Sequence, residues 1–344
     1  MIQERWKEKA TKWRKILAVL IALLLVLSLA NLSIGSVNIS FIDILKVLGG
    51  SELNEATTAI IWSFRIPKVL TAIAVGVGLG ISGLQMQTLF RNALAGPFVL
   101  GISSGASLGV ALLVMGAAYL PFQVSGVSSV LAACIGAFAV FGAVISMASK
   151  IRDITSLLIV GLMFGSAVGA VVSVLQYFGD PNQIQSYLVW TFGSLSGVTW
   201  VELRILIPII VLGSLTVFLL SDQLNMLLLG DEYAMSAGLN LRFVRIIIIS
   251  VTSILAGTIT AFCGPIAFIG IAVPHISRLL FNTSNHRLLQ PLVCFVGASV
   301  MLICDIISQL PGQVATLPIN AVTSLVGAPL IIWLIIKRKS LVAF

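Results

Sequence analysis

Two side chains in this sequence have the chemistry to carry a proton or bind a ligand in apolar surroundings, Asp305 and His275. A membrane carboxylate such as Asp305 can hold a coupling ion, or it can accept a hydrogen bond from a neighbouring helix. His275 directly follows Pro274, which leaves a helix carbonyl without its usual donor. We expect His275 and Arg278 to satisfy such carbonyls, with a gating or cargo contact as the alternative.

The sequence has no pattern for nucleotide binding or nucleophilic catalysis. It contains no GxxxxGK[ST] segment, so we expect no phosphate-cradling loop. No local Ser-His-Asp or Cys-His arrangement is present. The cysteines lie in or beside apolar segments without a CxxC partner, which is typical of buried small residues: Cys134, Cys263, Cys294 and Cys304. We therefore expect no catalytic site, no metal site and no cofactor bound by this chain.

The composition places these residues in a membrane protein with many spans. Of its 344 residues, 58% are hydrophobic and 9% are charged, whereas a soluble domain carries about 25% charged residues. A span needs about 20 apolar residues, so the apolar runs predict one all-α transmembrane domain, 1–344, with about ten helices. The expected spans are 16–34, 66–89, 97–117, 124–148, 155–178, 203–221, 243–263, 265–281, 288–309 and 318–336.

The net charge of +8 reports membrane topology rather than nucleic-acid binding. With ten spans and a cytoplasmic N-terminus, most basic residues fall on the cytoplasmic side, as the positive-inside rule requires. Both termini are then cytoplasmic, and the protein is expected in the cytoplasmic membrane. The basic residues expected outside are Lys46, Arg65, Lys68 and Arg204.

Two glycine ladders at four-residue spacing each smooth one face of a predicted helix. They are Gly101, Gly105 and Gly109, with Ser103 and Ser104 in the same segment, and Gly161, Gly165 and Gly169. Such faces allow close helix packing, and the alternative is a moving contact along a polar path.

A weak internal echo relates two Gly-Pro segments, 96–102 and 264–271. They open the third and eighth predicted spans, so the two copies would face opposite ways across the membrane. That arrangement predicts an inverted repeat of the kind many transporters use, although chance similarity is the alternative.

The predicted cytoplasmic segment, about 222–242, contains a compact helix. Asp231 and Glu232 suit the first turn of that helix, where the dipole favours negative charge. Gly238 suits a left-handed close of the helix. Tyr233 and Met235 would then be available to a cytoplasmic partner.

Over nearly its whole length the chain resembles the FecCD-type permease subunits of ABC importers for iron–siderophore complexes, haem and cobalamin. The matching segments are Arg65-Ile66-Pro67-Lys68, similar to R-[LI]-P-[RK]; Ser82–Gln87 with Leu89–Pro97, similar to S-G-x-x-M-Q…F-R-N-P-L-A-x-P; Leu100–Ala106, similar to L-G-[IV]-S-S-G-A; and Phe268–Ile271 with Pro274–Arg278, similar to F-[IV]-G-L…P-H-x-x-R.

The resemblance implies a type II ABC importer permease that moves a metal chelate, with an iron–siderophore complex expected and haem or cobalamin as alternatives. Its partners would be a second copy or a paralogous permease, two subunits that bind ATP and Mg, and an extracytoplasmic binding protein. An ion-coupled secondary carrier is a distant alternative.

The resemblance also implies roles for particular residues. ATPase coupling falls to Gly230, Asp231, Glu232, Ala234 and Gly238, and binding-protein docking to Arg65 and Lys68. Structural or gating candidates are Asn92, Pro97, Pro274, His275, Arg278 and Asp305. The chain departs from the family pattern at Ala93, Gln309, Thr316 and Asn320.

Overall fold

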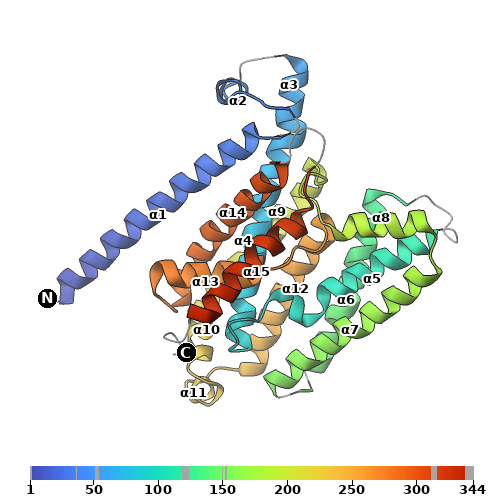
Figure 1. Cartoon of the computed structure of the whole chain (residues 1–344). Helices are drawn as coiled ribbons and strands as arrows, with labels where there is room; N and C mark the ends of the chain where they lie inside the picture. Colours follow the sequence, from blue (N-terminus) through green and yellow to red (C-terminus); the bar gives the residue numbers. More distant parts are fainter. Residues whose placement is uncertain are drawn as a thin grey trace.

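The computed structural model describes residues 2–35, 37–50, 54–117, 124–148, 150–151, 153–310 and 316–337. Every regular element in this part of the chain is helical (Figure 1). The helices are α1 (Ile2–Ser33), α2 (Phe41–Leu48), α3 (Glu55–Ile60), α4 (Ile66–Leu89), α5 (Ile102–Met115), α6 (Gly126–Ala148), α7 (Ile154–Phe178), α8 (Pro181–Thr191), α9 (Trp200–Leu219), α10 (Ser221–Leu228), α11 (Asp231–Ser236), α12 (Leu241–Cys263), α13 (Ile269–Phe281), α14 (His286–Gln309) and α15 (Ile319–Lys337).

The ten predicted spans correspond to ten apolar helices in these ranges. Seven helical segments are long and apolar enough to cross a membrane, and α5, α13 and α15 form three shorter apolar helices. The α-helices in the predicted segments 97–117 and 265–281 are short because other backbone precedes each of them, a 3₁₀-helix over Pro97–Leu100 before α5 and irregular backbone over 265–268 before α13. The all-α polytopic fold is thus confirmed. The basic side chains that precede Trp13 and follow Ile336 lie outside the described part.

The two ends of the bundle differ in architecture. α2 and α3 lie at one end, while α10 and α11 lie at the opposite end (Figure 1). Ser40 caps α2 by accepting a hydrogen bond from the backbone of Ile42, and Ile44 and Val47 are buried beneath it. α3 continues through a π-helical turn, Ile61–Arg65, directly into α4.

The helix α4 is the centre of the molecule. Twenty of its 24 residues are buried, and it packs against α9, α12, α13 and α14. Glycines permit the closest of these contacts, since a Cβ added at Gly76 would overlap the backbone of Gly297, and one added at Gly83 would overlap that of Gly270. Close backbone approach gives packing energy in lipid, where apolar burial between helices adds little.

The first glycine ladder is a packing surface. A Cβ at Gly105 or Gly109 would meet the backbone of α6, and one at Gly101 would lie 3.1 Å from the carbonyl oxygen of Gly161. α5 and α6 therefore form a tight pair, which favours the packing interpretation for this ladder. The second ladder is packed at one end and open at the other: a Cβ at Gly161 would overlap the backbone of Val99, only the Ser104 hydroxyl comes near Gly165, and no atom lies within 4 Å of a Cβ at Gly169.

The two segments of the predicted repeat share a local backbone form. Gly101 (φ 72°) precedes α5 in the left-handed region, and Phe268 (φ 67°) does the same before α13. A Cβ at Gly270 would meet Pro97 and the carbonyl oxygen of Leu79, near the middle of α4. The turn that precedes α5 thus contacts the start of α13 inside the protein. The inverted repeat as a whole stays a prediction.

The α4–α13 contact gives a stability prediction. The Gly83→Ala variant should lose more than about 2 kcal/mol of stability, at the upper part of the range for overpacking, because a backbone atom opposes the new methyl group. Thermal unfolding of the purified protein in detergent measures the loss.

Gly142→Ala is the matched control, since nothing lies within 4 Å of a Cβ at that position in α6. This substitution should leave stability unchanged or raise it by about 0.5–1 kcal/mol through helix propensity. Equal unfolding temperatures for the two alanine variants would contradict the packing argument.

Candidate functional site

The first candidate site is residues 222–242, the segment that the sequence predicts to be cytoplasmic and that we call the cytoplasmic element for that reason. The ends of α4 nearer to and farther from this element are called inner and outer after the same predicted topology. Gly230 (φ 116°) starts α11 and Gly238 (φ 86°) ends it, and both conformations favour glycine. Ala234 is fully buried beneath this short helix. The predicted compact helix, its acidic first turn and its left-handed close are therefore all present.

The exposed side of α11 carries Glu232, Tyr233 and Met235. The last two are 56% and 54% exposed, which is high for residues with large apolar parts. A carboxylate beside an aromatic and a thioether side chain is a suitable surface for a protein partner.

Asp231 pairs with arginines of other elements instead. One of its oxygens lies 2.5 Å from a guanidinium nitrogen of Arg91, and the other lies 2.5 Å from one of Arg245. Arg91 follows α4, and Arg245 lies on α12. Sequence reasoning missed both partners, because Arg91 is 140 residues away and no local pattern pairs it with Asp231.

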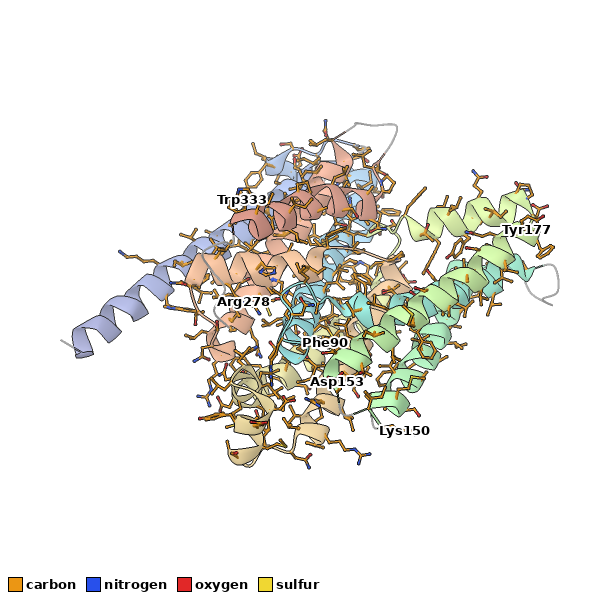
Figure 2. The ribbon with its side chains drawn as sticks, turned by 60° about the horizontal axis from the view of Figure 1, so that its bottom comes forward. Phe90, Lys150, Asp153, Tyr177, Arg278 and Trp333 are labelled. Atoms are coloured by element: carbon orange, nitrogen blue, oxygen red, sulfur yellow. The ribbon has the colours of Figure 1, made fainter. Side chains whose placement is uncertain are left out.

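The inner end of α4 is tied to α13 by a second set of contacts. Arg278 donates to the side-chain oxygen of Gln87 at 2.6 Å, and the Gln87 amide donates to the carbonyl of Ile271 at 3.2 Å. His275 lies 2.8 Å from the carbonyl oxygen of Ala93. Figure 2 shows Phe90, at the end of α4, and Arg278, on α13.

Pro274 lacks the N–H that would bond the carbonyl of Gly270, four residues earlier in the chain. Gln87 donates to the next carbonyl, that of Ile271, so the expectation that His275 and Arg278 satisfy the freed carbonyl stays a prediction. The ring of His275 also reaches the loop after α4. That loop is also shaped by Asn92, whose side chain accepts from the backbone of Leu94.

A third contact fixes α4 to α14 and α10. The imidazole of His286 lies 2.8 Å from the Thr88 hydroxyl and 2.9 Å from the Asn225 side-chain oxygen. The backbone of His286 also donates to Asn225. The inner end of α4 and the loop after it are thus held by polar groups from α10, α11, α13 and α14.

The outer end of α4 is held by a buried ion pair. Lys68 lies 3.0 Å from Asp305 of α14, and the exposed fractions of the two side chains are 10% and 3%. The same oxygen of Asp305 accepts from Asn31 of α1 at 2.6 Å and from Gln309 at 3.0 Å. Asp305 therefore bonds to neighbouring helices, as one of the two expectations had it.

Arg65 and Lys68 are predicted from the sequence as docking residues on the outer face. In the structure Arg65 is also buried, and it donates to the carbonyls of Ile34 and Val37. Neither side chain presents its charge to solvent. The role of these two residues in docking therefore stays a prediction that no exposed positive charge supports. Gln309, one of the departures from the family pattern, belongs to the same buried cluster.

The outer mouth holds two further departures from the family pattern. Asn320 accepts from the backbone of Ala267 at 3.1 Å, and its own backbone donates to Phe192. It therefore links the break before α13 to the segment after α8. Thr316 is exposed.

The serines near the ladders contact different helices. The hydroxyl of Ser103 lies 3.1 Å from that of Thr260 on α12, while Ser104 faces Gly165 on α7. A cavity of about 480 Å³ lies elsewhere, between α4, α9 and α14. Its walls are almost entirely apolar, so it offers no set of polar groups to orient a metal chelate.

Searched over the described residues, the chain brings no three His, Cys, Asp or Glu side chains together in a group that could hold a metal ion. The polar clusters join helices to one another, and the exposed face of α11 is free for a partner. The arrangement is suited to transmitting movement.

The sequence of this chain is similar to a known protein family and to characterised relatives. A model of the FecCD transport family matches residues 23–337. The hemin transport system permease protein HmuU of Yersinia pestis is 34% identical over 327 residues, which is 95% of this chain and 96% of that protein. The vitamin B12 import system permease protein BtuC of Vibrio vulnificus is 34% identical over 333 residues, 96% of each chain.

Solved structures agree with the sequence comparison. A protein described as a metal-chelate type ABC transporter, in an inward-facing conformation, superposes with a TM-score of 0.83 at 29% identity. The match covers 94% of this chain and 99% of that chain. A structure of PsaBC from Streptococcus pneumoniae, with a TM-score of 0.51 at 16% identity, shows likeness of fold alone.

The buried ion pair gives the prediction of this subsection. The Asp305→Asn variant leaves the Lys68 ammonium buried without its counter-charge, and such a change typically costs about 3–5 kcal/mol. We expect a correspondingly lower unfolding temperature in detergent. The double variant Lys68→Met/Asp305→Asn should recover part of the loss.

The exposed pair of Lys46 and Asp43, 3.8 Å apart on α2, is the control. Exposed pairs contribute about 0–1 kcal/mol, so Asp43→Asn should unfold close to wild type. A similar loss in Asp43→Asn and Asp305→Asn would show that burial of the pair has no special effect.

Proposed function

The chain belongs to the FecCD transport family and is the membrane permease of an ABC importer, and we propose that it imports a metal-bearing tetrapyrrole, haem or a cobalamin. Permeases named for hemin and for vitamin B12 align with nearly the whole chain. Both cargoes are large metal chelates built on a macrocyclic ring. The iron–siderophore complex expected from the sequence stays a second candidate.

The partners in this proposal follow from the ends of the bundle. Two ATPase subunits would dock on the cytoplasmic element, a second copy or a paralogous permease would complete the pathway, and an extracytoplasmic binding protein would deliver cargo near α2 and α3. The exposed Glu232, Tyr233 and Met235 carry the proposal, because they give α11 a surface that no described residue of this chain covers.

The cytoplasmic membrane with both termini inside completes the topology that we propose. ATP and Mg would be bound by the ATPase subunits, and the permease itself would change no bond in its cargo. Closure of the ATPase subunits would then move α11, and the helices attached to it would open the pathway.

The open part of the glycine ladder on α7 favours a cargo pathway along that face of the helix. Gly165 and Gly169 leave that helix face smooth, and Ser104 places a hydroxyl beside it. A path with small residues and few charges suits a bulky cargo, because it makes few strong contacts that would hold the cargo in place. A secondary carrier is disfavoured, since the carboxylate of Asp305 is already paired with Lys68.

The docking of the ATPase can be tested by charge reversal at Glu232. In the Glu232→Arg variant, the ATPase subunits should no longer co-purify with the permease, and ATP-driven uptake in proteoliposomes should be lost. The unfolding temperature should stay at the wild-type value, because Glu232 is exposed.

Glu55→Arg is the control, because Glu55 is exposed at the opposite end of the bundle, on α3. This variant should retain bound ATPase subunits. Normal co-purification and uptake with Glu232→Arg would refute the docking surface.

The cargo can be tested with the complete importer in proteoliposomes. Labelled haem, cobalamin and a ferric siderophore are supplied in parallel with their binding proteins. We expect ATP-dependent accumulation of haem or of cobalamin. Accumulation of the siderophore alone would overturn the proposal of a tetrapyrrole while leaving the importer function intact.

A further inference from the structure

We propose that Asp231 is a positioning residue that passes the movement of α11 to the end of α4 and to α12. This inference rests on the proposed docking of an ATPase at α11. It differs from a role in which Asp231 acts by touching the ATPase, as Glu232 does in the proposal above. The two neighbouring acids would then have different roles. Glu232 would contact the ATPase, and Asp231 would contact the transport helices.

The first support is the geometry of the carboxylate. Its two oxygens contact two arginines from different elements, each at 2.5 Å. Arg91 lies in the loop after α4, and Arg245 lies on α12. Arg91 also donates from Nε to the carbonyl of Leu227, at the end of α10, at 3.2 Å. One side chain of α11 is therefore joined to three other elements.

The second support is the backbone of Arg91. Its φ of 44° lies in the left-handed region, which is uncommon for a residue with a side chain and costs about 1–3 kcal/mol. Such a conformation persists where surrounding contacts hold it. The contacts to Asp231 and Leu227 hold the side chain, so a shift of α11 acts directly on a strained turn.

The third support is where that turn leads. Asn92 and Ala93 follow Arg91, and the carbonyl of Ala93 contacts His275 on α13. The backbone of Asn92 donates to Gln87, which accepts from Arg278. A displaced Arg91 would therefore disturb both α4 and α13, the two helices that meet at the glycine contact in the interior.

The exposure of the ion pairs of Asp231 with Arg91 and Arg245 fits a role in transmitting movement better than a role in stabilising the fold. The exposed fractions of the side chains are 41% for Arg91, 37% for Asp231 and 18% for Arg245. Pairs this exposed contribute little to folding. The guanidinium groups of Arg91 and Arg245 share one carboxylate, however, so they would repel each other if Asp231 moved away. The contact among these three side chains therefore depends on the position of α11.

The experiment uses the complete importer in proteoliposomes and measures three quantities. These are the amount of ATPase subunit bound to the permease, the rate of ATP hydrolysis, and the cargo imported per ATP hydrolysed. The variants are Arg91→Gln, Asp231→Asn and the double variant, with Asp231→Glu as the conservative replacement.

We expect each single variant to bind the ATPase normally and to import about tenfold less cargo per ATP, a change within the range of coupling between sites. The double variant should import no less cargo per ATP than the single variant with the lower ratio, because the two residues act through one contact. Asp231→Glu should recover part of the ratio, since it restores the charge.

Arg287→Gln is the matched control. Arg287 also pairs with an aspartate, Asp222, at 2.5 Å, and that pair joins α14 to α10 without touching α11. Its ratio of cargo to ATP should equal that of wild type. A lower ratio in Arg287→Gln would show that any ion pair near this surface has the same effect.

Wild-type coupling in Arg91→Gln would overturn the inference, as would additive losses in the double variant. If either variant accumulates poorly, Arg91→Lys retains the charge but loses the guanidinium geometry, and it should still lower the ratio. Loss of ATPase binding in Asp231→Asn alone would point to direct contact instead. A wild-type permease that binds no ATPase would refute the proposed function, which is a separate result.

Discussion

The rest of the structure depends on how α4 is held. This helix is buried along almost its whole length, where polar side chains normally need hydrogen-bond partners. Its ion pair and its contact with Arg278 lie at the two ends, where Lys68 meets Asp305 and Gln87 meets Arg278. The buried side chains of Ser82 and Gln85 have no hydrogen-bond partner among the described residues. The middle of α4 is smooth, with glycines against the backbones of α13 and α14. The helix is therefore anchored at both ends and closely packed between them.

The contrast between polar contacts at the ends of α4 and close packing in its middle explains where the charged residues lie. In lipid an unpaired charge is expensive, so arginine and lysine near span ends normally reach the interface. Lys68 and Arg65 turn inward instead and satisfy a carboxylate and two backbone carbonyls. Their burial ties α1, α4 and α14 into one unit at the outer end. The inner end combines exposed residues that suit a partner with inward ones that hold the helices.

Local patterns predicted much of this molecule. Apolar runs gave the spans because length and composition alone decide whether a helix can cross a membrane. The short helix of the cytoplasmic element was recognisable because acids at its start and Gly238 at its end act within a few residues. The paired residues were not recognisable, because Asn31 and Asp305 are 274 residues apart and meet only once the bundle has formed. A glycine ladder likewise shows that a face is smooth, but it does not show whether a neighbour fills that face, as at Gly105, or leaves it open, as at Gly169.

The interior breaks before α5 and α13 have an electrostatic result. α5 and α13 start at Ile102 and Ile269, which are both buried. The amino end of a helix carries a partial positive charge, so each of these breaks places such an end inside the protein rather than at its surface. A small cation meets an unfavourable potential beside such an end, as at the half-helix ends that exclude protons from water pores.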